Sequence, residues 1–417
     1  MRVLKFRLFI LSLALIFGSA LVCSKPRARE YLIEITSPEG LKAHLVPVTL
    51  ELPSQFSDTA TSVWEVSPVG GGREPAGQVY AQLRVDRESQ CESGRESKKI
   101  TFLWNPTAGG STQRFILRPA SGEIPPVFSF EDRGKMLLTL SQGGTPVLSY
   151  IYGMHLKEGV PQDRRRSSYI HPVYGLDGEV FSDDFPDDHY HHRGIFWTWP
   201  QVFIGRDSLS LWDIRGIYQR FERWLLRESG PVFARLSVQN GWYVGQRRVV
   251  DEKVRLTVFR AGQVGRVLDF KFTWEAVNEP VTILGSPDVK GYGGFSFRFA
   301  PFEDPVITTS GGVQVESSDL KPFPWADLSA RFEGRQPPSG VAVFDTAENI
   351  DFPNGWTLRF YGFLGVAWPG REPYTLEPGK PVNAHYRVWL HRGDAEKGKV
   401  SSVYAAYESG PRAKFIK

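Results

Sequence analysis

The sequence has 417 residues, with 50 Lys and Arg against 46 Asp and Glu and a formal net charge of +4. This near balance gives no reason to expect nucleic-acid binding, which needs a concentrated basic patch. Gly and Pro number 41 and 30, a share below that of disordered chains, so the composition indicates a folded chain with a sizeable apolar core.

The first residues predict a secretory signal peptide over residues 1–24. Arg2, Lys5 and Arg7 give it a charged start, and an unbroken apolar stretch follows. Removal of this leader takes three positive charges with it, so the mature chain is close to neutral. We therefore expect a secreted or periplasmic protein with no membrane span after leader removal. Cys91 is then the only cysteine, so no intramolecular disulfide can form.

Short alternating segments, separated by Gly, Pro, Asn and Asp, recur along the chain and predict an all-β protein. In residues 30–120 we expect a small immunoglobulin-like β-sandwich, because several short strands fall within about 90 residues. The clearest of these strands are predicted at Leu45–Leu52, Val79–Val85, Ile100–Trp104 and Arg114–Pro119.

The second domain is predicted to span residues 127–412, after a linker at Pro119–Pro126 that is rich in Pro and small residues. Its length is near the upper limit for a single core. Two large antiparallel sheets packed face to face would use that length. We expect a galactose-mutarotase-like β-supersandwich, which presents a broad concave sheet face where sugars bind.

Polar residues concentrate between Ser167 and Trp199. Four of the eight histidines lie in this stretch. The segment DDFPDD predicts a loop between two apolar strands, which is where a β-protein usually places its chemistry. If the segment HYHH is extended, His189 and His191 point to one face of the strand and His192 to the other.

The same stretch carries a family resemblance. The segment HPVYGLDGEVFSDDFPDDHYHHRGIFWTW resembles the signature of the PmoA-like family, a group of bacterial secreted proteins labelled methane oxygenase that carry a domain of unknown function. KGYGGFSFRFAP, NIDFPNGWTLRFYG and HYRVWLH extend the resemblance over roughly the last two thirds of the chain. It implies the supersandwich fold and a site in the histidine-rich stretch.

One interpretation of this stretch is a metal site. His189 and His191, two residues apart on one strand face, can both ligate a metal, and Asp184 can complete three protein ligands. The cofactor would then be one divalent metal ion. Such an ion would lower the pKa of a bound water or polarise a sugar hydroxyl or carbonyl group.

A second interpretation is metal-free acid–base chemistry at the same place. One imidazole can donate a proton near neutral pH while a carboxylate or another imidazole accepts one. Arg193 can pair with an acidic sugar or a developing oxyanion. The structural alternative is that the aspartates cap turns and Arg193 holds them by salt bridges. The candidate catalytic residues are His171, Asp184, His189, His191, His192 and Arg193.

Further candidates lie downstream and would bind the substrate. Trp325 and Asp327 offer a stacking platform and a hydrogen-bonding partner for a sugar ring. Twelve tryptophans favour a carbohydrate ligand, because aromatic rings stack on the apolar faces of pyranoses. The candidate substrate-binding residues are Lys290, Tyr292, Trp325, Asp327, Arg359 and His385.

These observations predict a secreted carbohydrate-active enzyme that uses proton transfer in the elimination, epimerisation or glycosidic cleavage of a sugar or oxidised sugar. Two alternatives stay open. One is a non-catalytic glycan-binding protein that uses the same sheet face. The other is a metal-dependent oxygenase, as the label of the PmoA-like family suggests.

Overall fold

The computed structural model describes residues 30–38, 45–53, 62–70, 79–87, 96–106 and 112–416. Within these ranges the regular structure is almost entirely β, with one α-helix, α1 (Val400–Glu408), and one short 3-10 helix, η1 (Gln162–Arg164). The predicted all-β class is therefore confirmed. No helix in these ranges is long and apolar enough to cross a membrane. The predicted signal peptide and Cys91 lie outside the described residues.

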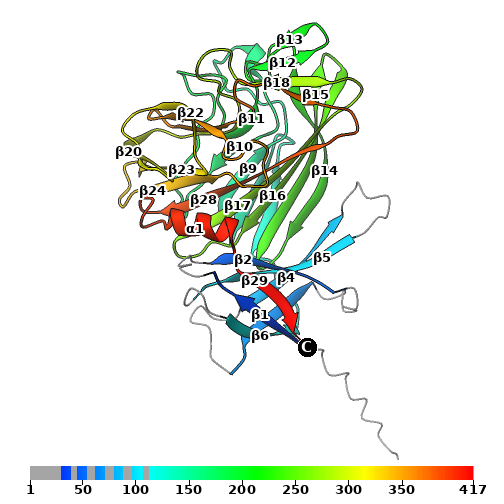
Figure 1. Ribbon diagram of the computed structural model, residues 1–417, viewed down its shortest axis with the longest axis vertical. Coiled ribbons are helices and arrows are strands. Elements are labelled where there is room, and N and C mark those ends of the chain that lie inside the picture. Colours follow the sequence, from blue (N-terminus) through cyan, green and yellow to red (C-terminus); the bar gives the residue numbers. More distant parts are fainter. Residues whose placement is uncertain are drawn as a thin grey trace, which may run out of the picture.

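A seven-stranded antiparallel sheet forms the lower part of the molecule in Figure 1. Inward-facing residues such as Trp64 and Phe102 share one apolar core. The last strand comes from the C-terminus and pairs with the first strand of the chain, an arrangement that the sequence did not predict. In order across the sheet, the strands are β2 (Val46–Glu51), β5 (Glu96–Trp104), β4 (Val79–Arg87), β3 (Val63–Pro68), β6 (Thr112–Pro119), β1 (Tyr31–Thr36) and β29 (Arg412–Ile416).

Two nine-stranded antiparallel sheets form the large upper part. The first consists, in order, of β22 (Ser318–Pro322), β25 (Gly355–Arg359), β26 (Phe363–Ala367), β19 (Gly294–Arg298), β11 (Ile195–Thr198), β10 (Tyr169–Val173), β9 (Thr145–Ile151), β8 (Leu137–Gln142) and β7 (Phe128–Arg133). The second consists, in order, of β14 (Tyr218–Ser229), β15 (Phe233–Val244), β16 (Arg247–Phe259), β17 (Gly265–Ala276), β28 (Val382–Arg392), β24 (Ser339–Phe344), β23 (Trp325–Phe332), β20 (Phe302–Thr309) and β21 (Gly312–Val313). A small sheet adds β13 (Asp207–Leu209), β12 (Gln201–Ile204), β18 (Val281–Leu284) and β27 (Tyr374–Leu376).

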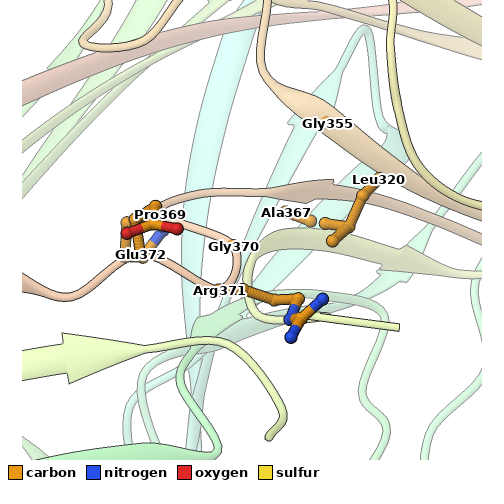
Figure 2. A pocket seen from close by; sticks show the side chains of 7 residues that line it. All are labelled: Leu320, Gly355, Ala367, Pro369, Gly370, Arg371 and Glu372. Carbon is orange, nitrogen blue, oxygen red and sulfur yellow. The ribbon is translucent and has the colours of Figure 1, made fainter. Parts of the chain in front are cut away.

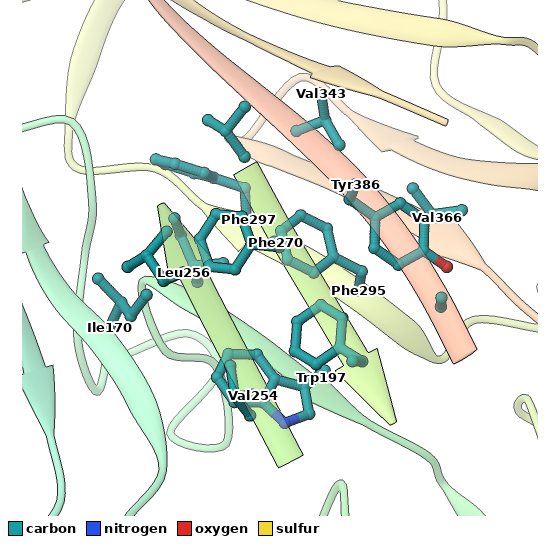
Figure 3. Packing of buried hydrophobic residues seen from close by; sticks show 14 of the residues in the cluster. Ile170, Trp197, Val254, Leu256, Phe270, Phe295, Phe297, Val343, Val366 and Tyr386 are labelled. Atoms are coloured by element: carbon teal, nitrogen blue, oxygen red, sulfur yellow. The ribbon is translucent and has the colours of Figure 1, made fainter. Parts of the chain in front are cut away.

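The two large sheets pack face to face around the main core, which is the predicted supersandwich (Figure 3). Strand periodicity decides which side chains enter this core, because successive residues point to opposite faces of a sheet. On β17, Phe270 and Phe272 are buried in the core, whereas Lys271 between them faces outward. Trp197 from the first sheet packs on Phe272, with ring centroids 4.8 Å apart.

A further apolar cluster joins the seven-stranded sheet to the outer face of the second large sheet. Val46 and Leu103 pack there with Phe233 and with residues of α1, which lies at this junction in Figure 1. Buried Gln82 adds polar contacts to this junction. Its side-chain oxygen accepts hydrogen bonds from the backbone N–H groups of Val232 and Phe233, both at 3.2 Å. The small module is therefore docked on the second large sheet.

Candidate functional site

The histidine-rich stretch lies on the outer face of the first large sheet. On β10 and β11, Ile170 and Trp197 enter the main core, whereas Tyr169 and Phe196 point to the opposite side. There they form an aromatic floor under the loop that carries the histidines. The buried members of this floor are Ile151, Tyr169, Phe196, Trp212 and Phe363.

The segment HYHH consists of consecutive turns, so the extended arrangement in which His189 and His191 would share a strand face does not form. The backbone N–H of His189 donates to the carbonyl of Pro186 at 3.0 Å, and that of His192 donates to the carbonyl of His189 at 2.9 Å. The proline and aspartates before the histidines favour such turns. As a result, His189 and His192 share one direction, and the ring of His191 stands across both.

Four aromatic rings form a stacked column in this loop. Successive centroids lie 5.2 Å apart from Tyr361 to His189, 4.6 Å from His189 to His192 and 4.9 Å from His192 to Phe363. Tyr361 is 43% exposed, whereas His192 and Phe363 are 3% and 2% exposed. The column therefore runs from solvent into the aromatic floor, and His189 lies next to its open end.

Burial keeps several of these imidazoles neutral. Loss of solvation lowers the pKa of His191 to about 3, with the charge of Arg166 as the next cause. Burial likewise lowers the pKa of His171 to about 4 and that of His192 well below its usual value. At neutral pH these rings can accept a proton or a hydrogen bond but carry no charge of their own.

Asp188 orients the more exposed histidine. Its Oδ2 lies 2.9 Å from Nδ1 of His189, and Nη2 of Arg298 donates to both of its carboxylate oxygens at 2.9 and 3.0 Å. Burial raises the pKa of Asp188, but the hydrogen bond from His189 and the charge of Arg298 together hold it below its usual value. Because Nδ1 faces the carboxylate, Nε2 is the nitrogen of His189 that remains for a ligand.

Asp184 is a buried carboxyl group with an unusual environment. The hydroxyl of Tyr169 donates to its Oδ2 at 3.0 Å, Nε of Arg193 lies 3.5 Å from its Oδ1, and Nε2 of His155 lies 3.8 Å from Oδ2. Burial raises the pKa of Asp184 to about 6, against the opposing effects of Arg193 and Tyr169. The group can therefore gain or lose a proton near neutral pH, as a general acid or base must.

Arg193 holds the loop in place. Its Nη1 donates to the carbonyls of Tyr190 and His192 at 2.5 and 2.6 Å, and its Nη2 donates to the carbonyl of Arg164 at 2.8 Å. The guanidinium carbon lies 3.4 Å from the ring centroid of Phe185, and the side chain is fully buried. This geometry matches the structural alternative for Arg193 and makes it a positioning residue.

The predicted metal ligands do not form a set. Among the described residues, no group of three or more His, Cys, Asp or Glu side chains is arranged to hold a metal ion. The turn stacks His189 against His192, and Asp184 interacts with Tyr169 and Arg193 instead. His171 lies apart from the column, with its Nδ1 3.0 Å from the hydroxyl of Ser182.

The candidate substrate-binding residues are divided between the two outer faces. Tyr292 packs on the aromatic floor, with its ring 4.8 Å from Trp212. Arg359 belongs to the first sheet and pairs with Asp319, and exposed Lys290 lies 4.0 Å from Asp288.

The other three candidates lie on the outer face of the second sheet. Trp325 belongs to the cluster beneath α1, Asp327 is buried against His391, and His385 pairs with Glu348. Strand alternation predicts that such residues share a face, but it does not tell which sheet they belong to.

Arg298, Tyr361 and His155 also contact the site. Arg298 and Tyr361 lie in two segments that carry the family resemblance, and their alternation with buried residues could have indicated an outward-facing pair. His155 stands alone in the sequence and reaches Asp184 only because its backbone pairs with that of Arg166. No local sequence signal marks this contact.

A separate pocket of about 470 Å³ opens at the edge of the first sheet (Figure 2). It contains none of the predicted catalytic residues. Its lining residues are Leu320, Gly355, Ala367, Pro369, Gly370, Arg371 and Glu372.

Comparisons with known proteins give a family but no activity. Residues 138–405 match the sequence model described as "Family of unknown function (DUF6807)". No curated protein matches the chain. A solved structure of a protein in the glycosyl hydrolase family 38 from Enterococcus faecalis is similar at 10% sequence identity and a TM-score of 0.47. The similarity covers 93% of this chain and 47% of that one, so this chain spans about half the length of that protein.

Proposed function

Because the chain belongs to a family of unknown function, DUF6807, its chemistry must be inferred from its own residues, and we propose that the histidine loop is an acid–base active site for sugars. One observation carries the proposal: Asp184, a buried carboxyl group with a pKa of about 6, shares a loop with the partly exposed imidazole of His189. Such a pair can remove a proton at one position of a substrate and return one at another. Elimination, epimerisation and glycosidic cleavage all need this.

Each residue then has a defined role. His189, oriented by Asp188, exchanges a proton through Nε2, and Asp184 is the partner that titrates near neutral pH. The exposed ring of Tyr361 offers a stacking surface for a pyranose. Arg193 keeps the loop in its turn conformation through three backbone carbonyls.

Two broader expectations belong to this proposal. The resemblance to the PmoA-like family remains a prediction, as does export to the periplasm or the medium. A sugar as substrate rests on the supersandwich architecture, the stacking surface and the aromatic content of the chain.

A test that does not require the substrate to be known in advance is solvent exchange. The protein is incubated in D₂O with a panel of neutral and acidic sugars and oligosaccharides, and deuterium at ring carbons, new double bonds and new reducing ends are measured. We expect one of these signals with the wild type and its loss in Asp184→Asn. His385→Gln is the matched control, because His385 lies on the other large sheet, where it pairs with Glu348.

The outcomes separate the alternatives. Binding of a sugar with no chemical change would favour a glycan-binding protein. A turnover that survives in Asp184→Asn would contradict the role of this carboxyl group.

A further inference from the structure

Buried positive charge surrounds the histidine loop. Arg166, Arg193 and Arg298 are only 4%, 0% and 6% exposed. Nη2 of Arg166 donates to two backbone carbonyls, those of Leu211 and Trp212, the latter at 2.8 Å. These carbonyls accept hydrogen bonds but bring no negative charge to offset the guanidinium group.

Several donors in this region have no acceptor. Nη1 of Arg166, Nε and Nη1 of Arg298, and Nε1 of Trp212 are buried and make no hydrogen bond. The ring of Trp212 lies 5.7 Å from His191 and 5.6 Å from His192, so its donor belongs to the same neighbourhood. All four atoms can only donate, and a buried donor without a partner is unfavourable.

Two unpaired buried acceptors also lie in this region, Oδ1 of Asp184 and Nδ1 of His192. Oδ1 of Asp184 lies 3.5 Å from Nε of Arg193, and Asp188 is held by Nη2 of Arg298 and by His189. The imidazoles of His191 and His192 are neutral, partly because the arginine charges oppose their protonation. The unpaired N–H donors at the site therefore outnumber its unpaired acceptors.

A carboxylate is the ligand group that suits this excess of donors. It accepts two hydrogen bonds in the geometry that a guanidinium group presents, and it brings a negative charge. The hydroxyl groups of a neutral sugar can accept hydrogen bonds but leave the charge unmatched. Arg298 is the best placed receiver, because its guanidinium carbon lies 4.9 Å from the centroid of the exposed Tyr361 ring.

We propose that the site takes an acidic sugar, a uronate, whose carboxylate is bound by Arg298 while its ring stacks on Tyr361. This inference rests on the proposed function and names its substrate class. A second buried guanidinium group, that of Arg166, adds to the positive potential that attracts the anion.

The test compares acidic sugars with their neutral parents in direct binding. Isothermal titration measures D-glucuronate, D-galacturonate and short oligouronates against glucose, galactose and the matching neutral oligosaccharides, at low and high salt. We expect at least about tenfold tighter binding of the acids, with the preference shrinking as salt rises. Arg298→Gln removes the preference, and Arg298→Lys keeps part of it because the charge remains.

The control is Arg392→Gln. Arg392 also donates to both oxygens of one carboxylate, that of Asp177, but it lies on β28 of the other large sheet. This variant keeps the preference for acids. If Arg298→Gln does not fold by circular dichroism, Arg298→Lys and the salt dependence of the wild type carry the comparison.

Each outcome is decisive for one of the two proposals. Equal binding of acidic and neutral sugars, an acid preference that survives in Arg298→Gln, or no binding of any uronate would overturn the inference. Tight binding of uronates through Arg298 without deuterium exchange, elimination or cleavage would support the inference and contradict the acid–base proposal.

Discussion

Two histidine–aspartate pairs lie on opposite outer faces of the sandwich, and they differ in what surrounds them. On the second sheet, Nε2 of His391 lies 2.8 Å from Oδ1 of Asp327, and both residues are 0% exposed. The hydroxyl of Ser329 donates to the other oxygen at 2.7 Å. On the first sheet, the pair of His189 and Asp188 lies at the open end of the stacked column.

The backbone seals the first of these pairs and leaves the second accessible. A Cβ atom added to Gly398 would lie 2.1 Å from Nδ1 of His391, so the chain runs directly over that ring. The side chains of His189 and Asp188 are 35% and 46% exposed. The same two residue types therefore form a packed structural pair on the second sheet and a ligand-accessible pair on the first. Burial and the presence of unpaired donors distinguish the two pairs.

The largest expected effect is on catalysis at the open pair. Replacement His189→Gln should lower kcat by about 10²–10⁴, because the variant cannot exchange a proton at that position. The free energy of unfolding should change little, since His189 is partly exposed. If His189→Gln keeps the wild-type kcat on the substrate identified by solvent exchange, His189 has no catalytic role and the open pair does not differ in function from the sealed pair.

The next effect is on stability at the sealed pair. Replacement Asp327→Ala should lower the free energy of unfolding by roughly 3–5 kcal/mol, as expected when one member of a buried pair is removed. Denaturant unfolding measures this loss, and turnover per folded molecule should be unchanged. A stable Asp327→Ala variant with reduced turnover would instead assign catalysis to the second sheet.

A smaller effect concerns pH. The folded pKa values of His171 and His191, about 4 and about 3, lie below the unfolded value of about 6.5, so the unfolded chain binds more protons as the pH falls below that value. Their contribution therefore destabilises the fold increasingly as the pH falls from about 6.5. The raised pKa of Asp184, about 6, acts in the opposite sense between roughly pH 6 and 4.

Replacing one imidazole isolates its share. His191→Asn should lose about 2 kcal/mol less stability than the wild type when the pH is lowered from 7 to 5. Chemical denaturation at the two pH values provides the comparison. Equal losses in both proteins would mean that His191 is not held neutral by the fold.

The smallest effect is expected at the surface of the second sheet. His385→Gln removes a pair with Glu348, whose side chain is 73% exposed, and should change stability by less than about 1 kcal/mol. Turnover should not change. A clear loss of turnover would instead support the predicted role of His385 in substrate binding.

Alternating patterns in the sequence predict many of the strands of the fold, but they do not predict which distant strands pair. The strands predicted at residues 79–85 and 100–104 match β4 and β5 because alternation is a local property. β29 was not predicted, since nothing in the segment Arg412–Ile416 indicates that its partner is the first strand of the chain.

The candidate site shows the same limit. The sequence places the histidines in one loop but does not predict that their rings stack. The turn that stacks His189 on His192 depends on Pro186 and on Arg193, whose side chain reaches the carbonyl of Arg164. Likewise, Trp325 was predicted to bind the substrate but lies on the other large sheet from the histidines, because alternation fixes the face of a strand but not its sheet.

The most direct test of the central claim is a crystal structure of the protein soaked with the uronate that binds most tightly. We expect a sugar ring stacked on Tyr361, with its carboxylate within hydrogen-bonding distance of Arg298 and a ring hydrogen or hydroxyl facing Nε2 of His189. A sugar bound in the pocket lined by Leu320 and Arg371, with the histidine loop untouched, would contradict the assignment of the uronate site to this loop.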